Sequence, residues 1–286
     1  MIPHETGRAR SGDVSIFYRR LGNRGQTPTE KNRGLTPILI VHGLQYFSWD
    51  WLEVAQALGA EREVLCMDMR GFGDSDWSAQ KDYSVPAMAQ DIVAVLDHAG
   101  WARAVLFGHS MGGRSATYAA AKHPARVSGL ALLDYTPENA PAGTKRTTEL
   151  VGNTPDAFPS LEAARAYLGP KKSPERYSHY LKDLSVKRDP YFRDQFRKVL
   201  AGGERPKLGV DLWQLIGEAR CPILSVRGTR SDMYAAETVA KMKAANPRLE
   251  VVAVEAGHDL AWENPAALLA AVRGFLEEKT REHERG

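Results

Sequence analysis

Cysteine is scarce in this chain of 286 residues, which contains only Cys66 and Cys221. Both stand in or beside apolar, strand-like runs, so we expect two buried, reduced thiols rather than a disulfide framework. That usage favours a cytoplasmic protein. The sequence has no Cys-x-x-Cys pair and no zinc-ligand spacing, so we expect no metal site.

Long hydrophobic runs and a strong charge of one sign are missing too. No stretch approaches the roughly 20 apolar residues that cross a bilayer. Met1-Ile-Pro-His-Glu lacks the basic and apolar regions of a signal peptide. The formal net charge is only +3, which is too small to indicate nucleic acid or an acidic membrane surface as a partner. The helix surfaces indicate no particular oligomer.

Short apolar runs instead alternate with helical patterns, which predicts a mainly parallel sheet with helices on both faces. The predicted strands are Val14–Tyr18, Pro37–Val41, Val64–Met67, Ala104–Phe107, Leu130–Leu133, Ile223–Val226 and Leu249–Val254. The helical patterns between them are Trp49–Leu58, Val85–His98, Met111–His123, Ala235–Ala245 and Pro265–Glu278. Residues 22–36 are polar and rich in turn formers, which predicts a surface loop, and the charged tail 277–286 is expected to fray.

The alternation stops between Asp134 and about Gly217. Amphipathic fragments separated by proline and glycine fill this stretch, at Ser160–Leu168, Pro174–Leu184 and Asp189–Ala201. We therefore predict a helical cap at residues 135–217, inserted into an α/β core of residues 1–134 and 218–286. Residues 137–210 hold 14 Lys and Arg against 9 Asp and Glu. This excess favours a solvated surface, with steering of an anionic substrate as the alternative.

The stretch Val105–Gly113 carries the strongest chemical signal. A predicted strand ends in Gly108-His-Ser-Met-Gly112, and an alanine-rich helical pattern follows at once. A G-x-S-x-G sequence between a strand and a helix places its serine on a sharp turn. The flanking positions must lack bulk, which glycine satisfies. We predict that Ser110 is a nucleophile.

A serine hydroxyl needs an adjacent base, and the base needs a third group that fixes its tautomer. In chains built on such a sheet the partners follow in the order serine, acid, histidine. His258 follows a predicted strand, in Glu255-Ala-Gly-His258, at the sheet edge where ligands bind. We predict that His258 is the base.

Two aspartates compete for the role of the acid. Asp232 follows the strand that precedes the strand of His258, and Asp134 ends the strand before the cap. Both stand at the correct edge of the sheet. We favour Asp232 because the acid usually comes one strand before the histidine. Asp134 is the alternative acid, and Asp259 would point elsewhere because it is adjacent to His258.

An oxyanion hole needs two donors aimed at the developing negative charge. We expect one to be the Met111 amide, directly after the nucleophile. The other should come from the loop after Pro37–Val41, where Leu44 is the best candidate. His42 precedes the serine and is expected to brace this loop through hydrogen bonds.

The motifs together resemble the α/β-hydrolase-fold superfamily, over nearly the whole chain. They are Val41-His-Gly43, Asp68-Met-Arg-Gly-Phe-Gly-Asp-Ser75, Gly108–Gly112 and Gly257-His258. The resemblance implies a mostly parallel eight-stranded sheet flanked by helices, a Ser-His-Asp hydrolase of the esterase or lactonase type, and no cofactor. It also implies a structural role for the loop that contains Asp68, Arg70 and Gly71. Dehalogenases and epoxide hydrolases of this superfamily place aspartate where Ser110 stands, so those chemistries are disfavoured.

Three functions compete at this point. The leading one cleaves a small-molecule carboxylic ester or lactone through an acyl-enzyme. The second cleaves a carbon–carbon bond in a vinylogous diketone acid. It is disfavoured because Leu44-Gln45-Tyr46-Phe47 stands where such enzymes carry a longer glycine-rich loop. The third is a non-catalytic receptor, which would not need an intact triad.

The cap is expected to select the substrate. Candidate contacts near loop edges are Gln45, Tyr46, Trp49, Tyr135 and Trp262, although the aromatic ones are more typical of core and cap packing.

Overall fold

A computed structural model of the chain describes residues 2–22, 35–168 and 174–278. Most of the loop predicted for residues 22–36, and the part of the charged tail beyond residue 278, lie outside the described residues. The description below refers to these three ranges.

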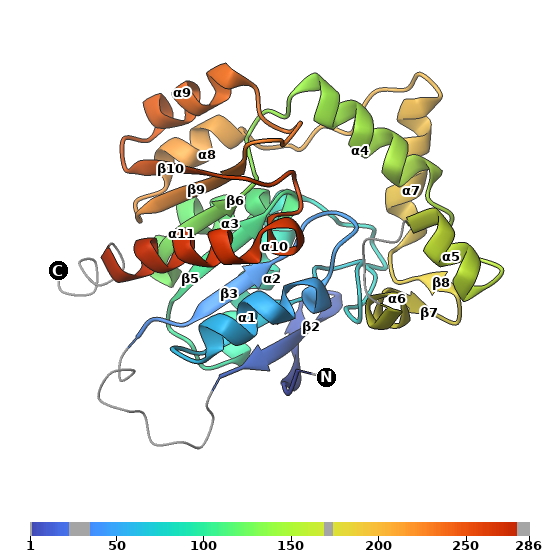
Figure 1. Cartoon of the computed structure of the whole chain (residues 1–286), viewed down its shortest axis with the longest axis horizontal. Coiled ribbons are helices and arrows are strands. Elements are labelled where there is room, and N and C mark those ends of the chain that lie inside the picture. Colours follow the sequence, from blue (N-terminus) through green and yellow to red (C-terminus); the bar gives the residue numbers. More distant parts are fainter. Residues whose placement is uncertain (1, 23–34, 169–173, 279–286) are drawn as a thin grey trace.

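The centre of the fold is an eight-stranded sheet with the strand order β1-β2-β4-β3-β5-β6-β9-β10 (Figure 1). The strands are β1 Glu5–Ser11, β2 Val14–Leu21, β3 Ile38–Val41, β4 Val64–Met67, β5 Ala104–His109, β6 Val127–Leu133, β9 Ile223–Gly228 and β10 Leu249–Val254. The six strands from β4 to β10 in that order run parallel, whereas β2 pairs antiparallel with both of its neighbours, β1 and β4. This confirms the predicted α/β fold. The edge strand β1 was not predicted because its sequence is mostly polar and lacks an alternating apolar pattern.

Helices cover both faces of the sheet. They are α1 Leu52–Gly59, α2 Val85–His98, α3 Met111–Lys122, α8 Leu212–Glu218, α9 Ala236–Ala245, α10 Leu260–Glu263 and α11 Pro265–Glu278. Helices α2, α3, α8 and α9 pack on one face, against side chains such as Leu39 and Leu106. Helices α1, α10 and α11 pack on the other, against Ile40 and Phe107. Alternate residues of one strand thus enter two cores, as expected for strands that are buried on both faces.

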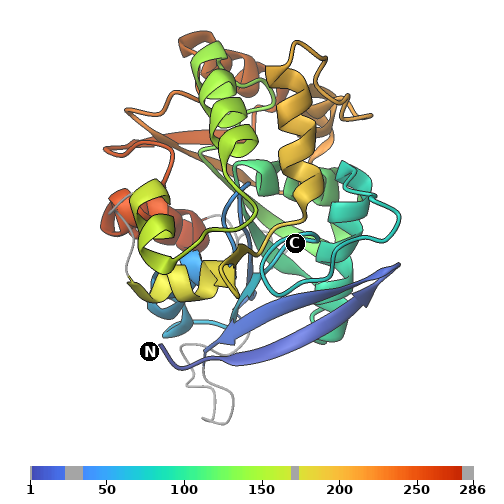
Figure 2. The ribbon, with the colours of Figure 1, turned by 90° about the vertical axis from the view of Figure 1, so that its right-hand side faces the viewer.

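The stretch between β6 and β9 forms a largely helical body at the carboxyl edge of the sheet (Figures 1 and 2). It contains α4 Pro141–Asn153, α5 Leu161–Leu168, α6 Pro174–Tyr180, β7 Leu181–Lys182, β8 Ser185–Val186 and α7 Pro190–Leu200. Helix α4 packs along α7. Helix α8, which begins inside the predicted cap range 135–217, instead packs on α3 and α9. The limits of the cap domain therefore stay a prediction.

One predicted helix is shorter than expected. The pattern favoured a helix over Pro174–Leu184, but α6 ends at Tyr180 and a tight hairpin follows. Asp183 and Leu184 form its turn with φ values of 49° and 62°. The hairpin buries Leu181 and Val186. The spacing of these apolar residues also suits a helix, but here two very short strands bury them.

The loop after β4 ties the helical body to the sheet. The Asp68 carboxylate accepts hydrogen bonds from the amides of Ser48 (2.6 Å) and Asp74 (2.8 Å). The Gly71 carbonyl accepts from the amide of Asp189 (2.8 Å), which caps α7. Arg70 donates two hydrogen bonds of 2.7 Å to the Asp91 carboxylate of α2. These contacts agree with the structural role expected for the loop.

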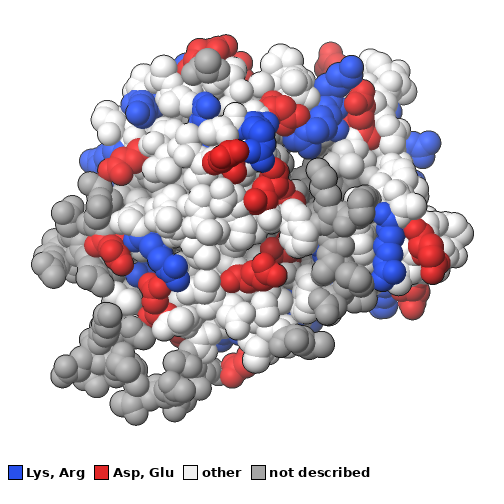
Figure 3. Space-filling model, in the orientation of Figure 1, with Lys and Arg blue, Asp and Glu red and all other residues white. Residues whose placement is uncertain are grey.

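Both cysteines are buried and free, as expected. Burial raises the pKa of the Cys66 thiol and raises that of Cys221 to about 12, so neither thiol is ionised near neutral pH. Within the described ranges no helix combines the length and the apolar character that a membrane span requires. On the face drawn in Figure 3, basic and acidic side chains are interspersed rather than gathered in one field.

The Arg70–Asp91 pair gives a test of the fold. Both side chains are almost fully buried, with exposed fractions of 4% and 1%. We expect Asp91→Ala to lower the free energy of unfolding by about 3–5 kcal/mol, because it leaves a buried guanidinium unpaired. Urea denaturation measures the loss.

Asp97→Ala is the matched control on the same helix, α2. Asp97 pairs with Arg126, but its side chain is 62% exposed, and such pairs contribute about 0–1 kcal/mol. An equal loss in the two variants would show that the buried pair does not hold the loop.

Candidate active site

Ser110 stands at the junction of β5 and α3, in the strained conformation expected of such a turn. Its φ and ψ are 49° and −117°. Its amide donates to the Leu133 carbonyl (3.1 Å), and its own carbonyl accepts from the Gly113 amide (2.9 Å). These bonds hold a backbone that L-residues rarely adopt. The turn is crowded: a Cβ on Gly112 would lie 2.4 Å from the Val41 carbonyl oxygen.

His258 lies between Ser110 and Asp134. Its Nδ1–H donates to the Asp134 carboxylate at 2.6 Å, and its Nε2 accepts from the Ser110 hydroxyl at 3.0 Å. The carboxylate fixes the tautomer, because an Nδ1 that donates leaves Nε2 free to accept a proton. The three side chains follow β5, β6 and β10, whose carboxyl ends meet at one edge of the sheet.

The preference for Asp232 as the partner of His258 is corrected by this geometry. Asp232 accepts two hydrogen bonds from the Arg146 guanidinium of α4, at 2.6 and 2.8 Å, and Arg146 lowers the pKa of this carboxyl group. The Asp232 carbonyl, in the loop after β9, also accepts a hydrogen bond from the Gly143 amide (3.0 Å). Asp232 thus joins the core to α4, and the alternative acid, Asp134, occupies the position beside the histidine.

Asp134 is suited to its position because its carboxylate is fully enclosed and fully satisfied. The residue has no exposed surface. Besides His258, its oxygens accept from the Gly228 amide (2.9 Å) and the Ser231 hydroxyl (2.5 Å). Its φ is 43°, a left-handed conformation that aspartate tolerates better than most residues.

The two predicted oxyanion donors lie beside the serine. Leu44, Met111 and Ser110 line the same cavity. The Gly43 carbonyl accepts from His42 Nδ1–H (2.7 Å) and from the Tyr46 amide (3.2 Å). Since the N–H of a trans peptide points opposite to its C=O, these bonds turn the Leu44 N–H away from them. His42 braces the loop as predicted, because its Nε2 also accepts from the Met69 amide (2.9 Å).

His109 contacts His258 and holds its backbone. Its Nε2–H donates to the His258 carbonyl (3.0 Å), and the two ring centroids are 4.8 Å apart. The side chain is buried, with 1% of the residue exposed. Burial lowers the pKa of His109 well below its usual value, and the nearby His258 lowers it further. A neutral His109 can therefore hold the backbone of residue 258 without placing a second positive charge beside it.

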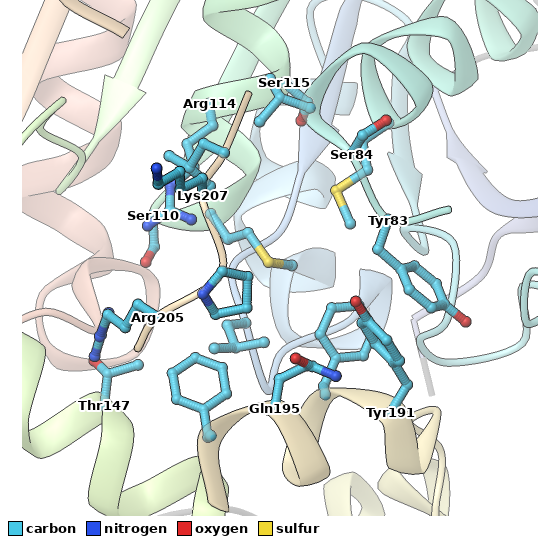
Figure 4. Close-up of a pocket in the computed structure, with 18 of the residues that line it drawn as sticks. Tyr83, Ser84, Ser110, Arg114, Ser115, Thr147, Tyr191, Gln195, Arg205 and Lys207 are labelled. Carbon is cyan, nitrogen blue, oxygen red and sulfur yellow. The ribbon is translucent and has the colours of Figure 1, made fainter. Parts of the chain in front are cut away.

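A cavity of about 490 Å³ opens from Ser110 between α3, α7 and the loop before α2 (Figure 4). Its apolar wall includes Met88, Tyr191, Phe192, Phe196 and Met233. Arg114 also lines it, one helical turn after the serine. No group of three or more His, Cys, Asp or Glu residues in the described chain is arranged to hold a metal ion.

The five residues proposed from the sequence as substrate contacts do not line this cavity. Gln45 accepts from the Tyr180 hydroxyl (2.8 Å), Tyr46 packs edge-on against His109, and Trp49 stacks on His179 at 3.6 Å. Tyr135 is buried behind Gly113, whereas Trp262 is 45% exposed. The lining residues of α7 gave no sequence signal, but Arg114 follows Ser110 at helical spacing and could have been found from that.

Comparison with known proteins agrees with the fold. The family described as alpha/beta hydrolase fold matches residues 36–265. The chain belongs to this family. It is 30% identical, over 83% of its length and 87% of the relative's, to the 3-hydroxybutyrate-oligomer hydrolase of Cupriavidus necator. It is 26% identical to the 2-(acetamidomethylene)succinate hydrolase of Mesorhizobium japonicum, over 86% and 90% of the two chains.

A solved structure extends the likeness to the whole chain. The crystal structure of an alpha/beta hydrolase from Novosphingobium aromaticivorans superposes with a TM-score of 0.77 at 28% identity, covering 97% of this chain and 99% of the other. The relatives with which this alpha/beta hydrolase shares most of its length are thus hydrolases.

The crowding around Gly112 gives a test of the turn. A methyl group there would overlap the backbone oxygens of Val41 and His42, so we expect Gly112→Ala to push α3 away from β3. The variant should lose about 1–3 kcal/mol of unfolding free energy and should react more slowly at Ser110 with a fluorophosphonate, measured by mass spectrometry.

Gly274→Ala in α11 is the matched control, since a methyl group there would meet nothing within 4 Å. It should gain about 0.5–1 kcal/mol, as glycine-to-alanine changes inside helices do, and should leave labelling unchanged. Unaltered labelling of Gly112→Ala would mean that the turn tolerates the added group.

Proposed function

We propose that the protein is a serine hydrolase that cleaves a carboxylic ester or lactone through an acyl-enzyme on Ser110. The observation that carries this proposal is the hydrogen-bonded series Ser110–His258–Asp134 at the edge of the cavity. Nucleophile, base and orienting acid are each within hydrogen-bond reach of the next, which is the arrangement that activates a hydroxyl group.

The first half of the reaction forms the acyl-enzyme. The Ser110 oxygen attacks the carbonyl carbon while its proton passes to His258 Nε2. Asp134 stabilises the imidazolium that results, through the bond to Nδ1. The amides of Leu44 and Met111 bind the oxyanion. His258 then gives the proton to the departing alcohol oxygen, and the carbon–oxygen bond breaks.

The second half regenerates the enzyme. Water attacks the acyl-enzyme and gives a proton to His258, the carboxylic acid is released, and the proton returns to the Ser110 oxygen. The two halves of the reaction use groups already in place, and together they consume one water for each ester bond. His109 acts as a positioning residue, because it holds the His258 backbone while the ring takes and gives the proton.

The proposal of an ester substrate is supported by the relative from Cupriavidus necator, whose name gives 3-hydroxybutyrate oligomers as its substrate. Oligomers of a hydroxy acid are joined by ester bonds. A cavity of about 490 Å³ with an apolar wall is within the ordinary range for small-molecule sites and suits a short acyl chain.

The direct experiment offers the purified chain 4-nitrophenyl butyrate, a γ-lactone and the 3-hydroxybutyrate dimer. We expect hydrolysis of at least one, together with stoichiometric fluorophosphonate labelling at Ser110, and the loss of both in Ser110→Ala. Absence of turnover and of labelling in the wild-type chain would overturn the proposal.

A paired substitution tests the acid. We expect Asp134→Asn to lower kcat by about 10⁴-fold, because an amide cannot hold the tautomer in which Nε2 accepts the serine proton. Asp232→Asn should change kcat by less than about tenfold, since Asp232 contacts Arg146. A thermal melt of each variant separates loss of activity from loss of fold.

The opposite ranking of the two variants would restore Asp232 as the acid. Equal large losses would indicate that the loop after β9, rather than the carboxylate beside His258, controls the rate.

A further inference from the structure

Arg114 is a cation that the proposed acyl transfer does not use. It lies four residues after Ser110 on α3 and lines the same cavity. Residues four apart share a helix face, about 5–6 Å apart at their Cβ atoms, and helical side chains lean toward the N-terminus. The guanidinium therefore extends on the side where the serine stands, as the view in Figure 4 shows.

The described residues provide no carboxylate partner for this guanidinium. Two deeply buried arginines elsewhere in the protein pair with carboxylates, Arg70 with Asp91 and Arg188 with Asp156. Within the described ranges, no side chain or carbonyl accepts a hydrogen bond from the Arg114 side chain and no carboxylate forms an ion pair with it. Burial lowers the pKa of Arg114, and Arg205 lowers it further against an opposing effect of Tyr135. Arginine nevertheless stays charged, so the partly exposed guanidinium of Arg114 is available to bind an anion that enters the cavity.

Most of the other charged side chains in the cavity wall are basic as well. Lys81, Arg205 and Lys207 also line it, against the single carboxylate of Asp82 among the described lining residues. Lys81 is paired with Asp189, whereas the Arg205 guanidinium donates to the Thr144 carbonyl (2.8 Å) and lies over the Phe196 ring. An anion that enters the cavity therefore meets a positive potential on its way to Ser110.

We propose that Arg114 binds a free carboxylate of the substrate, so that the enzyme prefers esters which carry a carboxylate a few bonds from the scissile carbonyl. The inference rests on the proposed acyl transfer at Ser110. The planar fork of arginine matches a carboxylate with two parallel hydrogen bonds. The apolar wall of Met88, Phe192 and Met233 encloses the carbon chain between the two ends, which makes the carboxylate an anchor that sets the position of the ester.

Two matched pairs of substrates test this preference. Monomethyl glutarate and dimethyl glutarate differ by one charge on the acyl side. 3-Acetoxybutyrate and its methyl ester differ by one charge on the alcohol side. In the wild-type chain we expect kcat/KM to favour the anionic member of at least one pair by about 10- to 100-fold, the range for a hydrogen bond to a charged group.

Arg114→Met should remove this preference, so that the ratio of kcat/KM between the anionic and the neutral member of the pair falls to about one. Arg114→Lys should keep part of it, because the charge remains but the fork is lost. The control is Lys122→Met, which removes a cation from the same helix outside the cavity, where Lys122 pairs with Glu218. It should leave the preference intact.

Calorimetric binding separates failure of this inference from failure of the proposed function. Ser110→Ala should bind monomethyl glutarate or 3-acetoxybutyrate, and Ser110→Ala with Arg114→Met should not, whether or not the wild-type chain turns over any ester. Equal binding by both proteins, or no binding by either, would overturn the role of Arg114. Absence of both turnover and Ser110 labelling in the wild-type chain would overturn only the hydrolase proposal.

Discussion

The enclosed carboxylate of Asp134 is the contact on which the rest of the site depends. It accepts from the Gly228 backbone, the Ser231 hydroxyl and the His258 ring, and so it joins the ends of β6, β9 and β10 at one point. Burying a charge is tolerated only when donors satisfy it, and here the donors come from the turn after β9 and the loop after β10. Displacing either segment would leave the enclosed carboxylate without donors. The position of the base is therefore coupled to the stability of the sheet edge.

The sequence predicted the parts of the site that local geometry determines. Ser110 and His258 follow strands in glycine-rich turns, and Gly112 shows why: a Cβ there would meet the backbone of the neighbouring loop. The parallel strands could be predicted from short apolar runs because they are buried on both faces. Leu44 and Met111 were proposed as oxyanion donors by the same reasoning, and both line the cavity beside Ser110.

The acid and the substrate contacts depend on long-range packing, which no local pattern records. Asp134 and Asp232 both follow strands at the same edge, and the choice between them depends on strand order and on the partner that Asp232 finds in Arg146. The cavity wall joins α2, α3 and α7, which stand far apart in the chain. The excess of Lys and Arg in residues 137–210 favoured a solvated surface, yet Arg205 and Lys207 line the cavity. The hairpin at Asp183 and Leu184 was missed because its strands are only two residues long.

The hydrogen bond from His109 ends on the main-chain carbonyl of residue 258, not on the imidazole. Every amino acid supplies that carbonyl, so the bond constrains where the loop runs and leaves the chemistry of its side chain open. The path of the loop and the reactivity of the side chain at residue 258 therefore depend on different groups. A descendant of this chain could exchange the histidine and retain a preformed binding chamber, which is one physical route from an enzyme to a ligand receptor on an unchanged scaffold.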